Sequence, residues 1–192
     1  MKLSKQTKVT EIVVENSHIW LNLAQAYEAE ISPYTHKKPD SNGQYPLDSD
    51  VTLSNRGYLI YHNSTPAGFS IIQTTNKNTH DICEFYICPH VRNHKLGKWF
   101  AHHLFDLHKG HWHVKQLINI NYATQFWRAV IRDYTGNNFT QHQYNHNYWG
   151  KVIEQRFSNY TDTPLTHPSE SRLKKSRRLS IPRWQPRKQA QS

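Results

Sequence analysis

The sequence is poor in cysteine: Cys83 and Cys88 are the only two among 192 residues. They stand five positions apart in a segment with the pattern of one strand, so their side chains point to opposite faces and no disulfide between them is expected. The lack of a disulfide framework favours a reducing compartment, and we expect a cytoplasmic protein. The sequence also lacks an apolar run near the roughly 18 residues of a membrane span. The apolar stretch after its basic N-terminus is too short for a signal peptide.

Several ligand-binding motifs are missing as well. There is no GxxxxGK[ST] phosphate loop and no GxGxxG followed by an acid about 20 residues later, which excludes two common nucleotide-binding folds. The chain has 14 histidines, but no Cys/His spacing matches a zinc site. We therefore expect surface histidines and no metal.

Positive charge is abundant and unevenly distributed. The net charge is +10, and residues 159–192 hold eight of the 24 Lys and Arg against two of the 14 acids. This segment is rich in Ser and Pro and has no hydrophobic period, so we predict a domain at residues 1–158 and a flexible basic extension at 159–192. Cations interleaved with Leu, Ile and Trp over residues 172–188 suit nucleic acid. The alternatives are a solvated tail, or packing on the domain or on a second copy in a homodimer.

Hydrophobic periodicity predicts an alternation of strands and helices before residue 159. A mixed sheet with helices on both faces follows from this order, and we predict an α/β (α+β) fold. The predicted elements are strand 8–15, helix 19–31, a long loop at 32–50, strands within 57–75 and at 80–88, helix 95–108, strand 111–118, helix 123–134, and strands 138–144 and 148–157.

The start of the helix at 95–108 is the most informative segment. A strand leads through "PHVRNH" into a helix N-terminus, where unpaired N–H groups and the helix dipole favour anions. Arg92, His94, Lys95 and Lys98 add positive charge, and Gly97 would allow close approach of a ligand. The alternative is a solvated basic helix start capped by Asn93.

This stretch resembles the R/Q-x-x-G-x-G/A motif of the GNAT superfamily of N-acetyltransferases, with Lys95 in place of the first glycine. Backbone amides still serve a pyrophosphate if Lys95 is helical. A longer stretch is similar to one bacterial subgroup of predicted acetyltransferases, and the similarity covers about residues 9–158. The strings that carry it are Leu104-Phe105-Asp106 with Gly110 and Trp112, Phe126-Trp127-Arg128, Val130-Ile131 and Tyr134-Thr135-Gly136.

The resemblance implies a central mixed, mostly antiparallel sheet flanked by helices, and transfer of an acetyl group from acetyl-coenzyme A directly to an amine. The pantetheine arm would pair with the strand end Tyr86–Cys88. The subgroup's asparagine at the start of the second helix aligns nearest Ile120, between Asn119 and Asn121. The implied cofactor-binding residues are Tyr86, Ile87, Cys88, Arg92, Asn93, His94, Lys95, Leu96, Gly97, Lys98 and Asn121.

Two residues are candidates for proton transfer. Glu84 lies in an apolar strand beside the implied cofactor and could be the general base, or else a structural hydrogen-bonding group or a substrate anchor. The family's acid tyrosine falls at Trp127, so Tyr134, two turns later on the same face, is the substitute. Its alternative role is packing at the helix end.

The acceptor and even catalysis are open from sequence. Asp40, Asp48 and Asp50 of the long loop favour an amine, while Lys37 and Lys38 argue against one. The alternative function is a non-catalytic module that senses an acyl-coenzyme A or binds nucleic acid through the tail.

Overall fold

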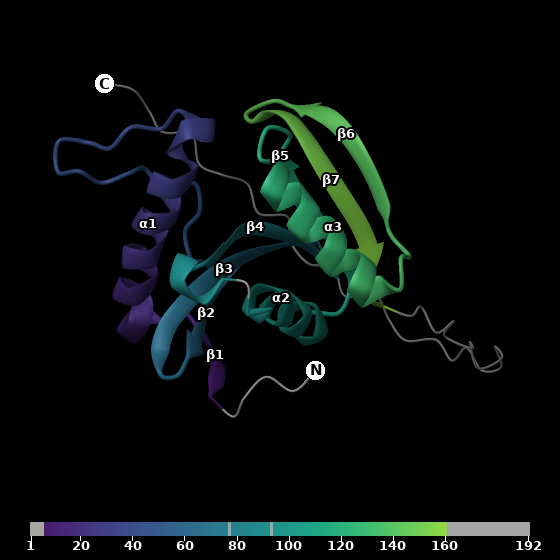
Figure 1. The fold of residues 1–192 in the computed structure, drawn as a ribbon, viewed down its shortest axis with the longest axis horizontal. Coiled ribbons are helices and arrows are strands. Elements are labelled where there is room, and N and C mark those ends of the chain that lie inside the picture. Colours follow the sequence, from purple (N-terminus) through teal and green to yellow (C-terminus); the bar gives the residue numbers. More distant parts are fainter. Residues whose placement is uncertain (1–5, 77, 93, 161–192) are drawn as a thin grey trace, which may run out of the picture. The chain divides into compact units, whose positions relative to one another are not determined.

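The computed structural model describes residues 6–76, 78–92 and 94–160 (Figure 1). The predicted order of strands and helices is confirmed, with shifts of a few residues at the ends. The elements are β1 (Thr7–Glu11), α1 (Ser17–Thr35), β2 (Asn55–His62), β3 (Thr65–Asn76), β4 (Thr79–Ile87), α2 (Leu96–Leu107), β5 (His111–Leu117), α3 (Asn121–Thr135), β6 (Thr140–His146) and β7 (Gly150–Ser158), with short 3-10 turns at Val14–Asn16 and Pro89–Val91.

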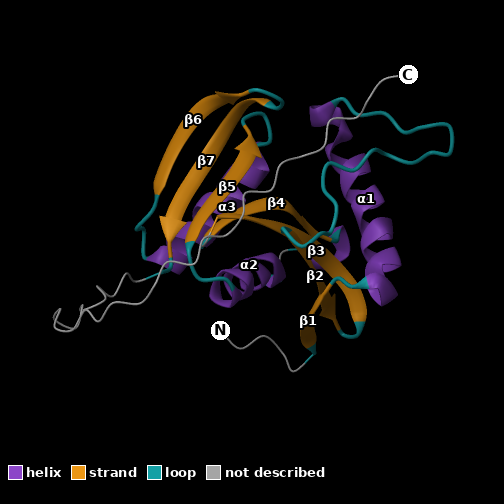
Figure 2. Cartoon of the chain, turned by 180° about the vertical axis from the view of Figure 1, so that it is seen from behind, coloured by secondary structure: helices purple, strands orange, loops and turns teal. Residues whose placement is uncertain are grey.

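The strands form one seven-stranded sheet in the order β1-β2-β3-β4-β5-β7-β6. All neighbours are antiparallel except β4 and β5, which are parallel because α2 connects them. Figure 2 shows this sheet from behind. The predicted class, a mixed and mostly antiparallel sheet flanked by helices, is confirmed.

Helices cover the two faces of the sheet at different strands. On one face α1 packs on β3 and β4, where the ring of Tyr27 lies 5.9 Å from Phe69 and 5.8 Å from Tyr86. On the other face α2 packs on β5, where Phe105 lies 4.8 Å from Trp112. The α3 helix packs on the same face, next to α2. The core therefore has two layers, one on each side of the sheet.

The parallel pairing of β4 and β5 is short. It runs from Thr79–His111 to Ile82–Val114 and then stops, although β4 continues to Ile87 and β5 to Leu117. The two strands diverge beyond that point, and the facing backbone groups of their second halves are not paired with each other. A sheet that splits in this way leaves room for a ligand between its halves.

A β-bulge in β4 lies at the same place. Ile72 of β3 faces Ile82, but the next residue, Ile71, faces Glu84, so Cys83 is the extra residue. Adjacent residues of β3 point to opposite faces, so Ile82 and Glu84 do as well. The bulge thus turns Glu84 to the face that α1 covers. Both Cys83 and Cys88 are free thiols.

The start of α2 differs from the expected geometry in one respect. Lys95 is the N-cap, in the left-handed region with φ 60° and ψ 9°, so the expectation of a helical Lys95 is wrong. A glycine adopts this conformation without strain. Gly97 serves packing, because a Cβ there would lie 3.3 Å from both Ile87 and Phe126.

The first residue of the predicted extension, Asn159, is bonded to the folded unit, and the boundary at 158/159 stays a prediction. The Oδ1 atom of Asn159 accepts a hydrogen bond from the N–H of Gly110 at 2.8 Å, and its Nδ2 donates to the carbonyl of Phe105. The basic segment over residues 172–188 lies outside the described residues. Among the helices that the structure describes, none is both long and apolar enough to span a membrane.

We predict that Lys95→Gly stabilises the protein by about 1 kcal/mol, because it relieves the strain of a left-handed non-glycine residue. Thermal or urea unfolding measures this change. The matched control is Lys98→Gly inside the same helix, which should destabilise by about 1 kcal/mol. Destabilisation by both substitutions would contradict the left-handed geometry of Lys95.

Candidate functional site

A cavity of about 820 Å³ opens where β4 and β5 diverge. Its walls come from α1, the loop at 48–49, the second halves of β4 and β5, the start of α2, most of the length of α3 and the start of β7. Lys115 and Gln116 are adjacent in β5 and therefore point to opposite faces of the sheet, yet both line the cavity. The cavity thus reaches both faces of the sheet through the gap between the strands.

Glu84 lines this cavity with only 4% of its surface exposed. Its Oε1 atom has no hydrogen-bond partner among the described residues. Burial raises the pKa of Glu84 to about 7, and the nearby charges of Glu28 and Asp48 add to the shift, while Ser49 and Lys37 oppose it. A carboxyl group with this pKa is half ionised near neutral pH, which is what a general base requires.

Two more acids of the cavity wall are bound to one lysine. The Nζ atom of Lys37 lies 2.8 Å from Glu28 Oε2 and 2.8 Å from Asp48 Oδ2, and it donates to the carbonyl of Pro46 at 3.1 Å. Burial raises the pKa of Glu28 even with Lys37 beside it. Burial alone would lower the pKa of Lys37, but its bonds to Asp48 and Glu28 outweigh that effect and raise it. The charge of Lys37 is thus already matched inside the wall.

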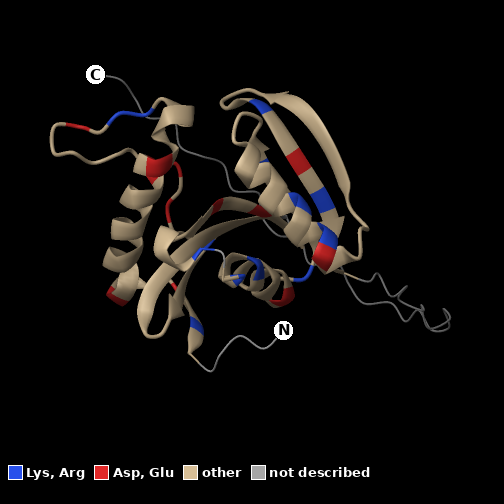
Figure 3. Ribbon diagram, viewed as in Figure 1, with Lys and Arg blue, Asp and Glu red and all other residues tan. Residues whose placement is uncertain are grey.

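Two of the cations near the start of α2, Arg92 and Lys98, also have acidic partners. Figure 3 marks the Lys and Arg residues in blue and the Asp and Glu residues in red along the ribbon. Arg92 donates from Nη1 and Nη2 to both oxygens of Glu30 at 2.9 and 2.8 Å, and from Nε to the carbonyl of Ile87 at 2.8 Å. Lys98 pairs with Asp133 of α3. These side chains are about one-third exposed, and partly exposed pairs of this kind are weak, so an anionic ligand can compete for the cations.

The structure brings most of the predicted residues to the cavity. Those that line it are Glu84, Tyr86, Ile87, Arg92, Lys95, Leu96, Gly97 and Lys98. Those that do not line it are Cys88, His94 and Asn121, of which His94 and Asn121 are exposed to solvent. Asn93 lies outside the described residues.

Tyr134 is not at the cavity. Its hydroxyl group donates to Asp106 Oδ1 at 2.9 Å and accepts from Asn159 Nδ2 at 3.1 Å, and its ring packs 5.1 Å from Phe105. It lies near the C-terminal end of α3, where Arg132 and Asp133 line the cavity but Tyr134 does not. The structure thus places Tyr134 where its alternative role, packing at the helix end, has it, and no contact with the cavity supports the assignment as the acid.

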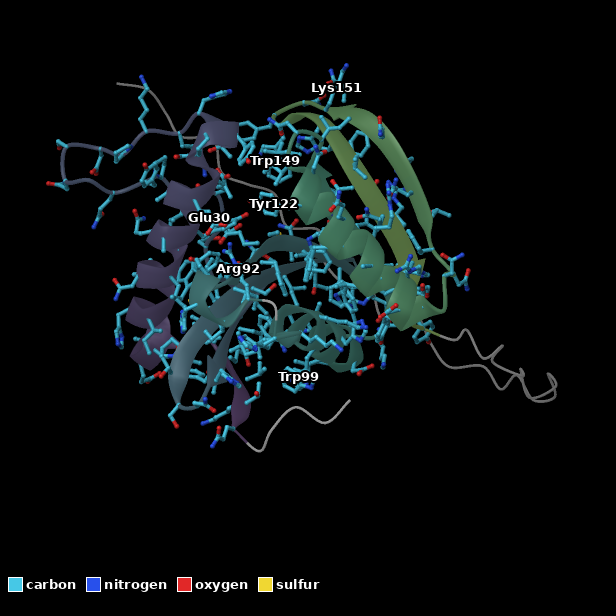
Figure 4. The ribbon with its side chains drawn as sticks, in the orientation of Figure 1. Glu30, Arg92, Trp99, Tyr122, Trp149 and Lys151 are labelled. Atoms are coloured by element: carbon cyan, nitrogen blue, oxygen red, sulfur yellow. The ribbon has the colours of Figure 1, made fainter. Side chains whose placement is uncertain are left out.

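Sequence reasoning missed several polar residues of the wall, among them Tyr122 and Gln116. Tyr122, in the first turn of α3, is half exposed and lies near the Arg92–Glu30 pair (Figure 4). Gln116 is buried among apolar neighbours of β5. The signal for Gln116 was available, because Trp112, Val114 and Gln116 alternate along the strand and only the last is polar.

The described residues contain no group of three or more His, Cys, Asp or Glu side chains with the geometry of a metal site. The carboxylates of the cavity wall are instead bound by Lys37 and Arg92, or buried singly as at Glu84. The donor set of the cavity thus favours a charged or hydrogen-bonding organic ligand.

We predict that Lys37→Ala destabilises the protein by about 3 kcal/mol, because it leaves Glu28, which is 1% exposed, without its cation. Chemical denaturation measures the loss. Lys38→Ala is the control, since Lys38 is the exposed neighbour and should change stability by less than about 0.5 kcal/mol. Equal effects of the two substitutions would contradict the buried network.

No protein-family model and no curated protein matches this sequence. Solved structures do match its fold. The ribosomal-protein-S18-alanine N-acetyltransferase of Escherichia coli aligns over 82% of this chain and 97% of its own, with a TM-score of 0.55 and 15% identity. RimL, a ribosomal L7/L12 alpha-N-protein acetyltransferase in complex with coenzyme A, aligns over 82% of this chain and 96% of its own, with a TM-score of 0.58 and 11% identity.

An Arabidopsis thaliana protein in complex with the bisubstrate analogue CoA-Ac-MVNAL aligns over 80% of this chain and 99% of its own. Its TM-score is 0.54 at 10% identity. At these identities the similarity concerns the fold. The chain has the fold of the N-acetyltransferases, as the resemblance at the start of α2 implied.

Proposed function

We propose that the protein is an acetyl-coenzyme A-dependent N-acetyltransferase. The observation that carries the proposal is the cavity between β4 and β5, which is lined both by the buried carboxyl group of Glu84, with one oxygen unpaired, and by the N-terminus of α2. Acetyl-coenzyme A has two groups that match these features. Its phosphates can bind at the helix N-terminus, and its thioester can lie near the base. The fold, shared with enzymes that use this donor, supports the same conclusion.

The residues at the cavity fit such a donor. Lys95, Leu96, Gly97 and Lys98 line the cavity at the helix start, where the first N–H groups of α2 have no partners within the helix and suit phosphate oxygens. Arg92 adds a guanidinium group at the same end. Tyr86 and Ile87 line the cavity on β4, beyond its last pairing with β5, so their backbone can pair with an extended chain. The donor, when bound, supplies an activated acetyl group.

The base in this proposal is Glu84. It lies on the α1 face of the sheet, next to Tyr27 and Glu28, and its pKa of about 7 lets the ionised form take a proton from an ammonium or amine group. The proton moves to Glu84 as the amine nitrogen attacks the thioester carbonyl. The C–N bond forms, the C–S bond breaks, and coenzyme A would leave as a thiolate that takes a proton from solvent.

The charge of the cavity wall supports an amine acceptor. Lys37 matches only one of its two carboxylate partners, Glu28 and Asp48, and Glu84 has no cation of its own. The net charge around Glu84 is therefore negative, which attracts a cationic amine. Repulsion of the amine by Lys37 is not expected, because the ammonium group of Lys37 is paired with Glu28 and Asp48. Lys38 is not part of the wall.

The direct test is incubation of the protein with acetyl-coenzyme A and a panel of primary amines, including peptide N-termini and lysine side chains. Release of free thiol is followed over time. Thiol release that depends on an amine supports the proposal. Binding of acetyl-coenzyme A without turnover on any amine would favour the alternative, a non-catalytic acyl-coenzyme A sensor.

We predict that Glu84→Gln lowers kcat by about 10²-fold at neutral pH, within the usual range for loss of a general base. In the unmodified enzyme kcat/KM should rise with pH and level off above about 7, because the ionised carboxylate is the active form. In Glu84→Gln this rise of kcat/KM with pH should be absent. Tyr134→Phe is the control, with kcat unchanged and a stability loss of about 1 kcal/mol from its lost hydrogen bond. An unchanged pH profile in Glu84→Gln would exclude Glu84 as the base.

We predict that Lys95→Glu raises the Kd of acetyl-coenzyme A by at least about tenfold, equivalent to about 1.4 kcal/mol. Lys95 lines the cavity at the helix start, and no described acid pairs with it, so the reversal breaks no ion pair of the fold. Isothermal calorimetry at low salt measures the change. Lys38→Glu reverses a charge away from the cavity and should leave the Kd unaltered. An unaltered Kd in Lys95→Glu would show that the phosphates of acetyl-coenzyme A bind elsewhere.

A further inference from the structure

Gln116 is a buried polar residue that the fold itself does not use. It is 6% exposed, and neither its Nε2 nor its Oε1 has a hydrogen-bond partner among the described residues. Leaving such a group unpaired costs about 1–3 kcal/mol. The side chain lines the cavity, so a bound ligand can supply the missing partners.

The position of Gln116 in β5 identifies the part of the cavity that it serves. Val114 is the last residue of β5 paired with β4, and Gln116 is two residues further, where the gap begins. Val114 faces Ile82, and Gln116 shares its side of the strand with Val114 and Trp112. This is the face that α2 and α3 cover, because Trp112 packs on Phe105 of α2.

Glu84 lies on the opposite face, because the bulge at Cys83 turns it toward α1. Glu84 and Gln116 are thus separated by the plane of the sheet. A ligand that enters from the start of α2 lies on the side of Gln116, and a ligand that reaches Glu84 from the α1 side does not share that face.

The unpaired atoms also limit the ligand chemistry. A primary carboxamide with both ends free needs an acceptor for its N–H groups and a donor for its oxygen. A protonated amine offers donors only, and a phosphate offers mainly acceptors. A secondary amide next to a thioester carbonyl offers both within a few bonds, and the pantetheine arm of an acyl-coenzyme A carries this arrangement at its reactive end.

We propose that Gln116 binds the thioester end of the donor, with Nε2 donating to a carbonyl oxygen and Oε1 accepting from the adjacent amide N–H. This inference rests on the proposed function and adds a residue that positions the donor for attack from the α1 side. Gln116 is thus a donor-positioning residue, while Glu84 acts on the acceptor.

The test compares Gln116→Met, which keeps the length of the side chain, with Gln155→Met. Gln155 is the matched control: it is a fully buried glutamine of β7 on the same face, since it faces Val114, but it does not line the cavity. Calorimetry measures the Kd of acetyl-coenzyme A, and thermal unfolding without ligand gives Tm.

Gln116→Met should raise the Kd by at least about fivefold, the equivalent of one hydrogen bond. It should also raise the Tm of the ligand-free protein by about 2–4 °C, because an unpaired polar group is removed from the interior. Gln155→Met should leave the Kd unchanged. Gln116→Glu, which cannot donate when ionised, should weaken binding at least as much as Gln116→Met.

Other outcomes separate the inference from the proposed function. An unmodified protein that does not bind acetyl-coenzyme A overturns both. An unmodified protein that binds, with a Gln116→Met variant of equal affinity, overturns only the role of Gln116. A fall in Tm in Gln116→Met with unchanged Kd would show that Gln116 is a structural residue held by internal water.

Discussion

The end of the pairing between β4 and β5 is the constraint on which the rest of the structure depends. Beyond Ile82 and Val114 the two strands have no shared hydrogen bonds, so the sheet splits while its outer strands stay paired. Backbone groups left open in a folded protein need other partners. A cavity that water or an extended ligand fills satisfies them. The same split exposes Glu84 to one side of the cavity and Gln116 to the other.

Burying acids beside this cavity costs free energy, and the fold offsets that cost with a paired cation at some of the acids but not at Glu84. Glu28 is held by Lys37, and Glu30 by Arg92, so each carboxylate has a cation within 3 Å. Glu84 has none, and its raised pKa shows that the fold favours its protonated form. Stability gained from that proton is present at low pH and is lost as pH rises from the usual carboxyl pKa toward about 7. At neutral pH the ionised form of Glu84 therefore lowers the stability of the folded state, at the position where the proposed function needs a base.

Periodicity was enough to predict the order of strands and helices, because alternation and amphipathic spacing are local properties of the chain. The family resemblance named Glu84 and Leu96, and both line the cavity. Periodicity could not predict the bulge at Cys83, which depends on the register with β3 and decides the face on which Glu84 lies. It could not predict that the ring of Tyr134 packs 5.1 Å from Phe105, while its neighbours Arg132 and Asp133 line the cavity.

The separation of Glu84 and Gln116 by the sheet bears on how direct transfer between two substrates can proceed. A donor and an acceptor that enter from the same side compete for space, whereas entry from opposite faces lets each reach the gap without displacing the other. Proximity of the reacting groups would then follow if both ligands ended at Ile82 and Val114, where the pairing of the two strands begins to open. The strands that border the gap belong to one continuous sheet, so this geometry is set before either substrate binds. The rigidity of the outer strand pairs, and not closure of a loop, would therefore align the amine with the thioester.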